Sequence, residues 1–520
     1  MEYEFPIDKD DPVRLLCHII GGLNLKTLRD SYKRIGENSV QPWQMLAILL
    51  EARFLNVSGT RSIEDMCKND IRFLYILRGK KAPDHSTLAR FQKEHLGASV
   101  IEDIFQTFLK LLKASGAIAE ETVFIDGTKI ESVASKTQYV WKKNVLRNRQ
   151  TCLEKAATVF DRCEEKLSIS IKHGKNIRLR ELKKLRRKLR QKQRSEKIVF
   201  VHGAGKRKTE LQRIFEQLDE TVSKLKRYTW QMHFLGGRNS MAKTDIDATY
   251  MRVKEDNRKN GQLKAAYNVQ YCVDSEFIVG VDIFQNPADV NTLIPTLERM
   301  EERGLHYENV VADAGYDGEE NSAYLEAHGQ KAFIQPSNYE MRKTKRWKSD
   351  IGRRENMTYL PDEDAYLCSQ GRKIKAVGTS TRTNKQGTYT AKLTRYACES
   401  CKDCPCKTKC IHGNHSNLPM EERDKHFEVS KKFQQYREEQ TKRVDSKEGR
   451  ELMKNRGIQA EGVFSSVKSA MKFRRFLTKG IENVRIEAIL YAMAHDILKL
   501  HFKIQNGRFG EHLFPIRQAA

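Results

Sequence analysis

The sequence predicts a mixed α/β core that is interrupted twice and preceded by an all-helical region. Runs of β-branched and aromatic residues, typical of strands, occur at 118–136, 264–284 and 308–316. A basic helical stretch follows the first run, and a polar stretch rich in Gly and Cys follows the last. We expect seven segments, namely 1–117 (helical, for DNA binding or dimerisation), 118–140 (core), 141–238 (basic helical insertion), 239–340 (core), 341–450 (Cys-rich insertion), 451–505 (core) and 506–520 (tail).

The composition points to a polyanionic partner. Lys and Arg number 94 against 68 Asp and Glu, which gives a net charge of +26. A ribosome-associated or non-specifically basic protein is the alternative. No apolar stretch approaches the ~18 residues of a membrane span, and the acidic start MEYEFPIDKDD lacks a signal-peptide core. Eleven cysteines, five of them within 398–410, argue against a secreted disulfide framework, so we expect a cytoplasmic, nucleoid-associated protein.

The first 117 residues show the apolar spacing of helices. WQMLAILLEARFL and SIEDMCKNDIRFLYIL predict two helices, and DHSTLARFQKEH predicts a third that begins with capping residues and presents Arg90 outward. A short helix, a turn with Gly79 and Pro83 and a basic helix resemble a helix-turn-helix, which predicts a DNA contact at Arg90. An ordinary helical bundle fits the pattern equally well.

The stretch from Trp141 to Trp230 is basic and helical. It holds 27 Lys and Arg against 10 Asp and Glu. Leucines recur at three- and four-residue steps, at 179, 182, 185 and 189, as in an amphipathic helix with a cationic outer face. A solvated helix face is the usual meaning of a charge run, but the excess here has one sign, which favours binding to a phosphate backbone.

The remaining core elements carry three acidic residues. Asp126 follows Val123-Phe124-Ile125, where we expect a buried strand to end, and Asp313 follows Val310-Val311 in the same way. A hairpin around Asp274-Ser275 and a helix NTLIPTLERMEERG lie between these two strands. Glu461 lies on a stretch with helical apolar spacing, and the cations near it are Arg456, Lys468, Arg474 and Arg475.

Three carboxylates in one cleft would suit metal-dependent chemistry on phosphodiesters. Two Mg²⁺ ions about 4 Å apart activate an oxygen nucleophile and stabilise the leaving oxygen, and carboxylates are the ligands they prefer. Gly127 leaves space beside Asp126 for a DNA backbone. The alternative is that Asp126 and Asp313 are turn residues after strands. Asp245, Asp247 and Asp256 are expected to cap turns rather than to bind metal.

Several motifs together resemble the DDE-type insertion-sequence transposases with an RNase H-like core. The narrower resemblance is to the branch with a tyrosine–arginine–glutamate–lysine signature. The matching stretches are IDGTKIESVASK, TDIDATYMRVKEDNRKNGQLKAAYNVQYCVD, VVADAGYDGEEN, IQAEGVFSSVK and FRRFLTKGIENVRIEAILYAMAHDILKL. The resemblance implies an RNase H-like mixed sheet, two Mg²⁺ ions (with Mn²⁺ as a substitute) on Asp126, Asp313 and Glu461, and transposon-end phosphates on Arg456 and Lys468.

The resemblance also implies the reaction and the partners. Cleavage at transposon ends would free a 3′-OH that attacks target DNA, and two terminal inverted repeats would be held by a homodimer. Two departures from the signature are visible: Met453 stands in the tyrosine position, and Arg456 precedes Glu461 by five residues instead of four. The alternatives are a nuclease or domesticated relative without strand transfer, and a non-catalytic DNA-binding regulator.

The Cys-rich insertion has the spacing of a metal site. Thiolates two residues apart can share a tetrahedral Zn²⁺, which would stabilise a loop-rich insert without an apolar core of its own. Cys368 and His412 lie nearby. An iron–sulfur cluster and free thiols are the alternatives. The expected structural zinc ligands are Cys398, Cys401, Cys404 and Cys410.

Overall fold

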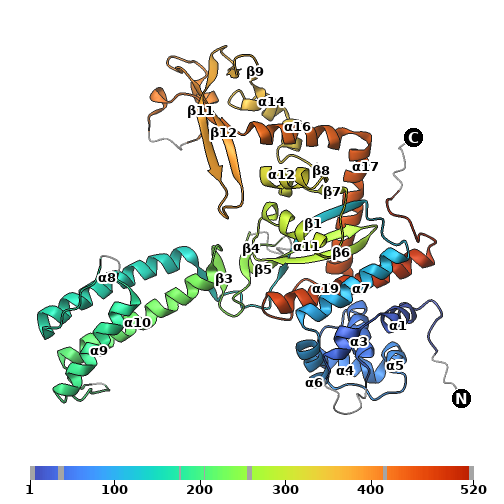
Figure 1. Cartoon of the computed structure of the whole chain (residues 1–520), viewed down its shortest axis with the longest axis horizontal. Helices are drawn as coiled ribbons and strands as arrows, with labels where there is room; N and C mark the ends of the chain where they lie inside the picture. Colours follow the sequence, from blue (N-terminus) through green and yellow to red (C-terminus); the bar gives the residue numbers. More distant parts are fainter. Residues whose placement is uncertain are drawn as a thin grey trace.

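A computed structural model describes residues 6–32, 40–174, 177–203, 205–253, 261–413 and 418–514. Figure 1 shows a helical bundle near the N-terminus, a central sheet with helices around it, a long helical arm and a β layer at the far end. In the described residues no helix is both long enough and apolar enough to cross a membrane.

The N-terminal region folds as a bundle of short helices. Asp70 caps a new helix by accepting from the Arg72 amide, so the stretch expected as one helix at 62–77 is two. The next helix bears Arg90 on its exposed end. The helices are α1 (Pro12–Gly22), α2 (Lys26–Asp30), α3 (Pro42–Phe54), α4 (Thr60–Asn69), α5 (Ile71–Leu77), α6 (His85–Arg90), a π-helical turn (Phe91–His95) and α7 (Ala98–Ala114).

A six-stranded mixed sheet forms the core. Its order is β4-β5-β1-β7-β8, with β6 also paired to β5. β1 runs antiparallel to β5 and parallel to β7. The expected hairpin is confirmed, since Ser275 and Glu276 both take positive φ between β5 and β6. The strands are β1 (Thr122–Glu131), β4 (Thr249–Arg252), β5 (Leu263–Asp274), β6 (Phe277–Phe284), β7 (Asn309–Ala312) and β8 (Lys331–Ile334).

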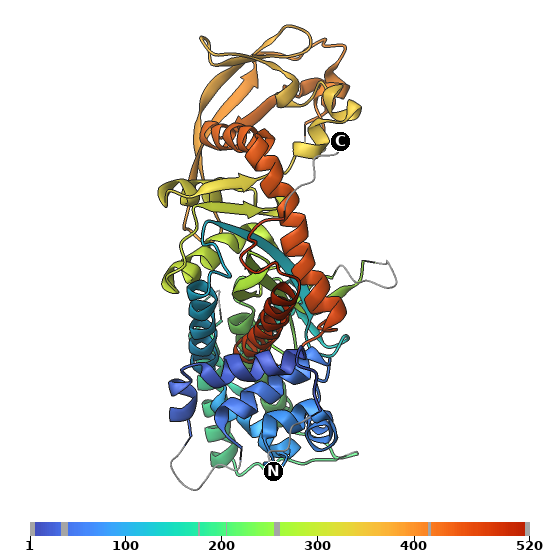
Figure 2. The ribbon, with the colours of Figure 1, turned by 90° about the vertical axis from the view of Figure 1, so that its right-hand side faces the viewer.

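Helices cover the sheet and connect it to the bundle. α19 (Ile481–Gln505) packs on β6 and also on α3 and α7, so it lies between the sheet and the bundle (Figure 2). α17 (Lys447–Arg456) contacts β7 and β8, and α16 (Lys431–Asp445) contacts β8. α11 (Leu293–Glu302) and α12 (Glu319–Ala327) belong to the β6–β7 and β7–β8 connections. The architecture is the expected mixed sheet flanked by helices.

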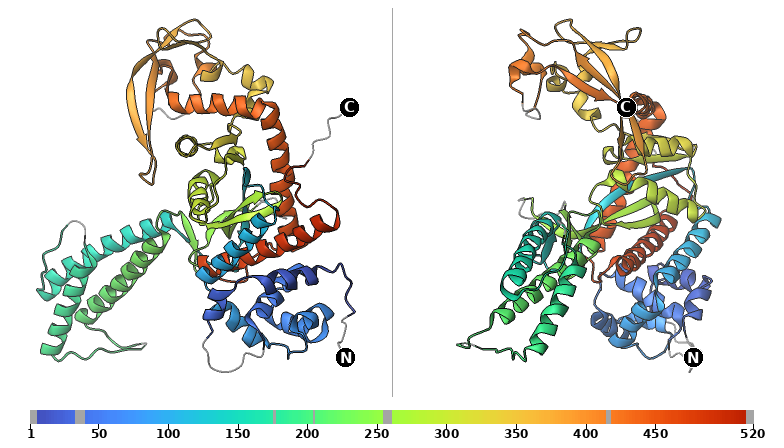
Figure 3. Two further views of the ribbon diagram at one scale, coloured as in Figure 1. Left: turned by 45° about the vertical axis from the view of Figure 1, so that its right-hand side comes forward. Right: turned by 60° about the vertical axis from the view of Figure 1, so that its left-hand side comes forward.

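The basic insertion is an arm of three helices with its own apolar core. The helices α8 (Lys142–Leu167), α9 (Leu179–Ser195) and α10 (Glu210–Leu235) bury Leu182, Leu185 and Leu189 among other apolar residues. A short antiparallel pair, β2 (Tyr139–Trp141) with β3 (Ser240–Ala242), closes the root of the arm. Figure 3 shows the arm projecting from the core.

The Cys-rich insertion contains a sheet that the sequence analysis did not predict. Five antiparallel strands follow the order β13-β12-β11-β10-β9, and Tyr366, Ile374, Tyr396 and Val429 form a small core with two cysteines. The expectation of an insert without its own core is therefore wrong. Its strands are half exposed, which leaves the polar composition that had suggested loops. The elements are α13 (Tyr339–Arg342), α14 (Lys345–Lys348), β9 (Thr358–Leu360), β10 (Ala365–Leu367), β11 (Lys373–Thr383), β12 (Thr390–Cys398), α15 (Lys407–Cys410) and β13 (His426–Val429).

Candidate active site

Asp126 and Asp313 lie side by side on neighbouring strands. Ile125 of β1 is paired in parallel with Ala312 of β7, and each acid directly follows its partner of this pair, Asp126 within β1 and Asp313 just after β7. Asp313 keeps an extended backbone after β7, so the alternation of the strand carries its side chain to the face of the sheet that Asp126 uses. The parallel pairing of β1 and β7 therefore places two of the three predicted carboxylates together.

β1 does not end at Asp126, contrary to expectation. The strand continues to Glu131, because β5 pairs with it along this whole length. Asp126 is largely buried, and the Gly127 amide donates to its Oδ1 at 2.7 Å. Asp313 does stand after its strand, where its side chain accepts from the Gly315 amide at 2.7 Å. The turn alternative thus fails for Asp126 and holds locally for Asp313.

Gly127 allows side chains to pack closely on one face of the sheet and does not leave room for DNA. It points to the face opposite Asp126. A Cβ at this position would come within 3.0 Å of both Gln270 Nε2 and Asp289 Oδ1. The space that the sequence analysis assigned to a DNA backbone is therefore filled by protein side chains.

A hydrogen-bond network that the sequence analysis missed fills that face. Asp289 accepts from Lys129 Nζ at 2.9 Å, Asn268 Nδ2 at 2.7 Å and Gln270 Nε2 at 3.1 Å. The Tyr316 hydroxyl donates to Gln270 Oε1. The sequence signals were Lys129 two residues after Gly127 and Tyr316 three residues after Asp313.

The protonation of Tyr316 follows from its surroundings. Burial raises the pKa of the Tyr316 hydroxyl well above its ordinary value, and the negative charges of Asp289, Asp126 and Asp313 raise it further. The group therefore remains a neutral donor at physiological pH. The network holds the middle of β1, next to Asp126, and the turn after β7, next to Asp313.

Arg456 connects the third acidic segment to Asp126. Its Nη1 donates to Asp126 Oδ2 at 3.1 Å, with side chains 18% and 12% exposed respectively. The following π-helical segment, Gly457–Glu461, contacts β1 and β5. The segment that ends at Glu461 therefore lies against the strand that carries Asp126.

The π-helical segment accounts for the unusual spacing of Arg456 and Glu461. In a π-helix the backbone bonds join residues five apart, so residues five apart share a face as residues four apart do in an α-helix. The extra residue between Arg456 and Glu461 is accommodated in this way. α18 (Gly462–Ser465) and a second π-helical segment, Ser466–Ala470, then lead to the predicted phosphate contact at Lys468.

The other predicted site residues have different surroundings. Glu461 is exposed and Lys468 is largely buried, while Met453 packs against the core. Arg474 Nε donates to the Lys468 carbonyl at 3.3 Å, and Arg475 donates to the carbonyls of Ser132 and Val133. Arg475 thus ties the segment before α19 to the chain after β1, a contact that the prediction of DNA binding did not include.

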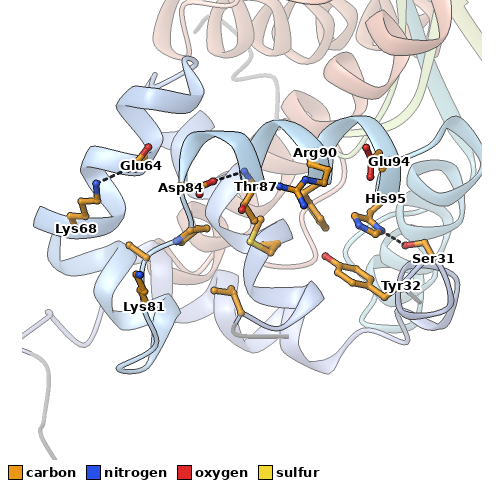
Figure 4. Close-up of a pocket in the computed structure, with 15 residues that line it drawn as sticks. Ser31, Tyr32, Glu64, Lys68, Lys81, Asp84, Thr87, Arg90, Glu94 and His95 are labelled. Carbon is orange, nitrogen blue, oxygen red and sulfur yellow. Dashed lines mark hydrogen bonds and ion pairs between the residues drawn. The ribbon is translucent and has the colours of Figure 1, made fainter. Parts of the chain in front are cut away.

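Arg90 belongs to a separate pocket in the N-terminal bundle. The pocket has a volume of about 990 Å³ and is lined by residues 31–95 alone. Figure 4 shows Arg90 beside Thr87, and His95 further along the same helical run next to Ser31 and Tyr32. Acidic residues also line it, among them Glu64 and Asp84, so the pocket itself does not have the one-signed charge of a phosphate site.

Two further predictions concern acids outside the site. Asp245 and Asp247 do not cap local turns; they accept from the amides of Gly480 and Ile481 and so cap the start of α19, which is distant in sequence. Asp245 also accepts from Ser132 Oγ at 2.5 Å. Asp256 lies outside the described residues.

The described residues contain no group of three or more His, Cys, Asp or Glu side chains arranged to hold a metal ion. Asp126 instead faces the Arg456 guanidinium. The guanidinium supplies positive charge beside a buried carboxylate, which a divalent ion bound to the oxygens of Asp126 and Asp313 would otherwise supply. The exposed Glu461 side chain would have to complete the set of ligands.

Six cysteines line one small cavity in the β insertion. Its volume is about 20 Å³, enough for one ion or water, and it includes Cys368 and Cys406 besides the four predicted ligands. Burial, with the Cys401 thiol beside it, raises the pKa of Cys398 to about 11. Burial also raises the pKa of Cys410. The Lys425 amide donates to Cys401 Sγ at 3.3 Å, as backbone amides do to metal-bound thiolates.

Comparison with family models defines the class of the protein. Residues 1–94 match a transposase domain (DUF772), and residues 238–400 and 367–501 each match a transposase DDE domain. The comparison with curated proteins gave no match. The fold, a mixed sheet flanked by helices, is that of a DNA transposase with an RNase H-like core. The chain belongs to the DDE transposases of insertion sequences.

Proposed function

We propose that Asp126, Asp313 and Glu461 hold two Mg²⁺ ions, for which Mn²⁺ can substitute, and so catalyse both cleavage at transposon ends and strand transfer. The observation that supports this most is the register of β1 on β7, which sets Asp126 beside Asp313. When bound, such ions activate the attacking oxygen and neutralise charge at phosphorus. Both reactions are in-line attacks on phosphorus, so one site serves them.

The protein's own residues prepare the site. Arg456 neutralises Asp126 and holds the carboxylate in place before the site is loaded. Loading would free the guanidinium for a DNA phosphate, in line with the arginine of the tyrosine–arginine–glutamate–lysine branch. Lys468 would hold a second phosphate from the same helix. Met453 packs against the core and supplies no hydroxyl in the tyrosine position.

The DNA partners follow from the reaction. We propose that the substrates are terminal inverted repeats and target DNA, that two ends are held by a homodimer, and that Arg90, Arg474 and the basic arm contact the backbone. The matches to transposase domains favour these partners over those of a nuclease without strand transfer or of a non-catalytic regulator.

An end-cleavage and strand-transfer assay with Mg²⁺ or Ca²⁺ tests the proposal. Asp126→Asn, Asp313→Asn and Glu461→Gln should each lower cleavage by at least about 10³-fold, because a lost metal ligand costs several kcal/mol in the transition state. DNA binding should be retained. The matched control is Asp161→Asn on the exposed side of α8. Cleavage by Asp126→Asn at the rate of the control would contradict the proposal.

We also propose a structural Zn²⁺ on Cys398, Cys401, Cys404 and Cys410. The shared cavity, and the burial of three of the four, support this choice. Metal analysis of the purified chain should give one zinc per chain. Because the pKa of Cys398 is raised, binding must release protons, so zinc affinity should rise with pH. Cys398→Ser should lower the zinc content, whereas Cys152→Ser in the arm should not. Iron, or no metal, in the wild-type chain would contradict the zinc site.

A further inference from the structure

A pocket of about 550 Å³ lies at the root of the basic arm. Residues of β2, the first turns of α8, the last turns of α10 and the chain at β3 line it. Figures 1 and 3 show this root where the arm joins the sheet, next to β4. None of the predicted catalytic or phosphate-binding residues lines the pocket, so it is distinct from the acid site.

Four aromatic residues line the pocket, Tyr139, Trp141, Tyr228 and Trp230, and two of them are half exposed. Tyr139 is 49% exposed and Trp230 is 47% exposed. Tyr139 lies 6.1 Å from Trp141 and packs edge-on against Tyr250 of the sheet at 5.9 Å. The ring of Trp230 packs against the ring of Phe234, with 4.7 Å between the ring centroids. Aromatic faces that are held in place and open to solvent are platforms for stacking.

The polar groups of the pocket suit a nucleotide. Three amides line it, on Asn144, Asn148 and Gln231, and no hydrogen bond joins these side chains to any other described residue. Arg227 and Lys243 supply positive charge, and no Asp or Glu is among the lining residues. Amides pair with the edges of bases, and cations bind phosphates. The pocket therefore combines stacking faces, base-edge partners and phosphate partners without a repelling carboxylate.

The pocket lies at a distance from the acids that one DNA molecule can span. The pocket residue Tyr139 packs on Tyr250, which pairs with Ala265 of β5. The neighbouring residue Ala266 pairs with Glu131 at the end of β1, so the pocket lies close to that end of the strand. Asp126 and Glu131 are five residues apart on β1, which is about 17 Å along a strand. A rise of about 3.4 Å per base pair makes this distance roughly five base pairs.

We propose that this pocket binds an unstacked nucleobase of the DNA strand that is held at the acid site. The base stacks on Trp230 and Tyr139, the amides contact its edge, and Arg227 with Lys243 holds the adjoining phosphate. The inference rests on the DNA-processing function, and it adds a site that selects DNA with an unpaired nucleotide near the cut.

Binding of the full-length chain to labelled duplexes without divalent metal tests the inference. The probes are a blunt duplex, the same duplex with a three-thymidine overhang, and one whose overhang is abasic. The wild-type chain should bind the thymidine overhang more tightly than the other two. Trp230→Ala should weaken binding of that probe about five- to 150-fold, the range of one lost base stack, and should leave blunt-duplex binding unchanged.

Two further variants separate stacking from folding. Trp230→Phe retains a stacking face and should keep most of the preference for the overhang. Phe502→Ala removes an aromatic ring of similar exposure, 48%, on α19 and should leave the preference intact. The proposed base binding would be wrong if the wild-type chain bound all three probes equally, or if Trp230→Ala kept the preference for the overhang. Neither result would contradict the transposase function. A wild-type chain that binds no DNA would overturn both.

Discussion

At the scale of single residues, the ion pair between Arg456 and Asp126 determines the state of the acid site. Both partners are largely buried, so neither is compensated by water when the other is absent. A divalent ion on Asp126 would take over the compensating role. The pair therefore links the stability of the metal-free protein to metal binding.

Removing the guanidinium should reveal this link. We expect Arg456→Ala to destabilise the metal-free chain by about 2–3 kcal/mol, because it removes the cation that lies beside a buried carboxylate. Excess Ca²⁺ should restore part of the loss, since the ion neutralises Asp126. Thermal unfolding with and without Ca²⁺ measures both effects.

A matched variant gives the control for that measurement. Arg437 pairs with Asp317, whose side chain is fully buried and which is not one of the predicted metal ligands. Arg437→Ala should also lower the melting temperature, but Ca²⁺ should not restore it. Equal responses of the two variants to Ca²⁺ would contradict the compensating role of Arg456.

At the scale of secondary-structure elements, the π-helical segment Gly457–Glu461 sets the position of Glu461. Its extra residue can be removed by deleting the exposed Ile458, which would leave a regular helix with Arg456 four residues before the glutamate. We expect this variant to fold and to keep cleavage within about tenfold of wild type. End cleavage together with a thermal melt measures the outcome.

Deletion of Lys454 in α17 is the contrasting variant. Each residue turns an α-helix by about 100°, so removing one residue before Arg456 would turn the Arg456 side chain away from Asp126. Cleavage should fall below detection. If both deletions abolish cleavage equally, the π-helical segment does not absorb the extra residue as we infer.

The N-terminal bundle contains a buried acid that should make its stability depend on pH. Burial of Glu51 in α3 raises its pKa to about 8, against a lowering effect of Arg72. Between the ordinary value of 4.5 and about 8 the folded state keeps a proton that the unfolded state releases. The free energy of unfolding should therefore fall as pH rises through this window.

The variant Glu51→Gln isolates this contribution, because it replaces the carboxyl group by a neutral amide of similar shape. Its stability relative to wild type should increase by a few kcal/mol between pH 5 and pH 8. Denaturant unfolding at several pH values measures the difference. A difference that stays constant, or that shrinks with rising pH, would show that Glu51 is ionised in the folded bundle.

At the scale of the whole molecule, the basic arm supplies charge far from the acids. Lys183, Lys184 and Arg187 are exposed on α9, away from the buried leucines. If they contact phosphates, replacing all three by Gln should reduce the slope of log affinity against log salt by up to about 3. Filter binding from 50 to 300 mM salt measures the slope. An unchanged slope would mean that this face of the arm stays in solvent.

Much of the architecture could be predicted from the sequence because it rests on local patterns. The period of apolar residues marked the arm helices, and the Asp274-Ser275 hairpin followed from β-branched flanks around a turn. The β insertion was missed because its strands bury only one narrow face, so their composition remained that of loops. The division into seven segments stays a prediction.

By itself the sequence determined the candidate acids, the two interruptions of the core and the charge of the arm, because each depends on residue type and on spacing over short distances. Only the tertiary structure decided that Asp126 lies beside Asp313, that Arg456 pairs with Asp126 and that Gly127 packs on Asp289. These contacts join residues 160 or more positions apart, and their geometry depends on strand register and on one extra residue in a helix. Local preferences of the chain do not encode either quantity.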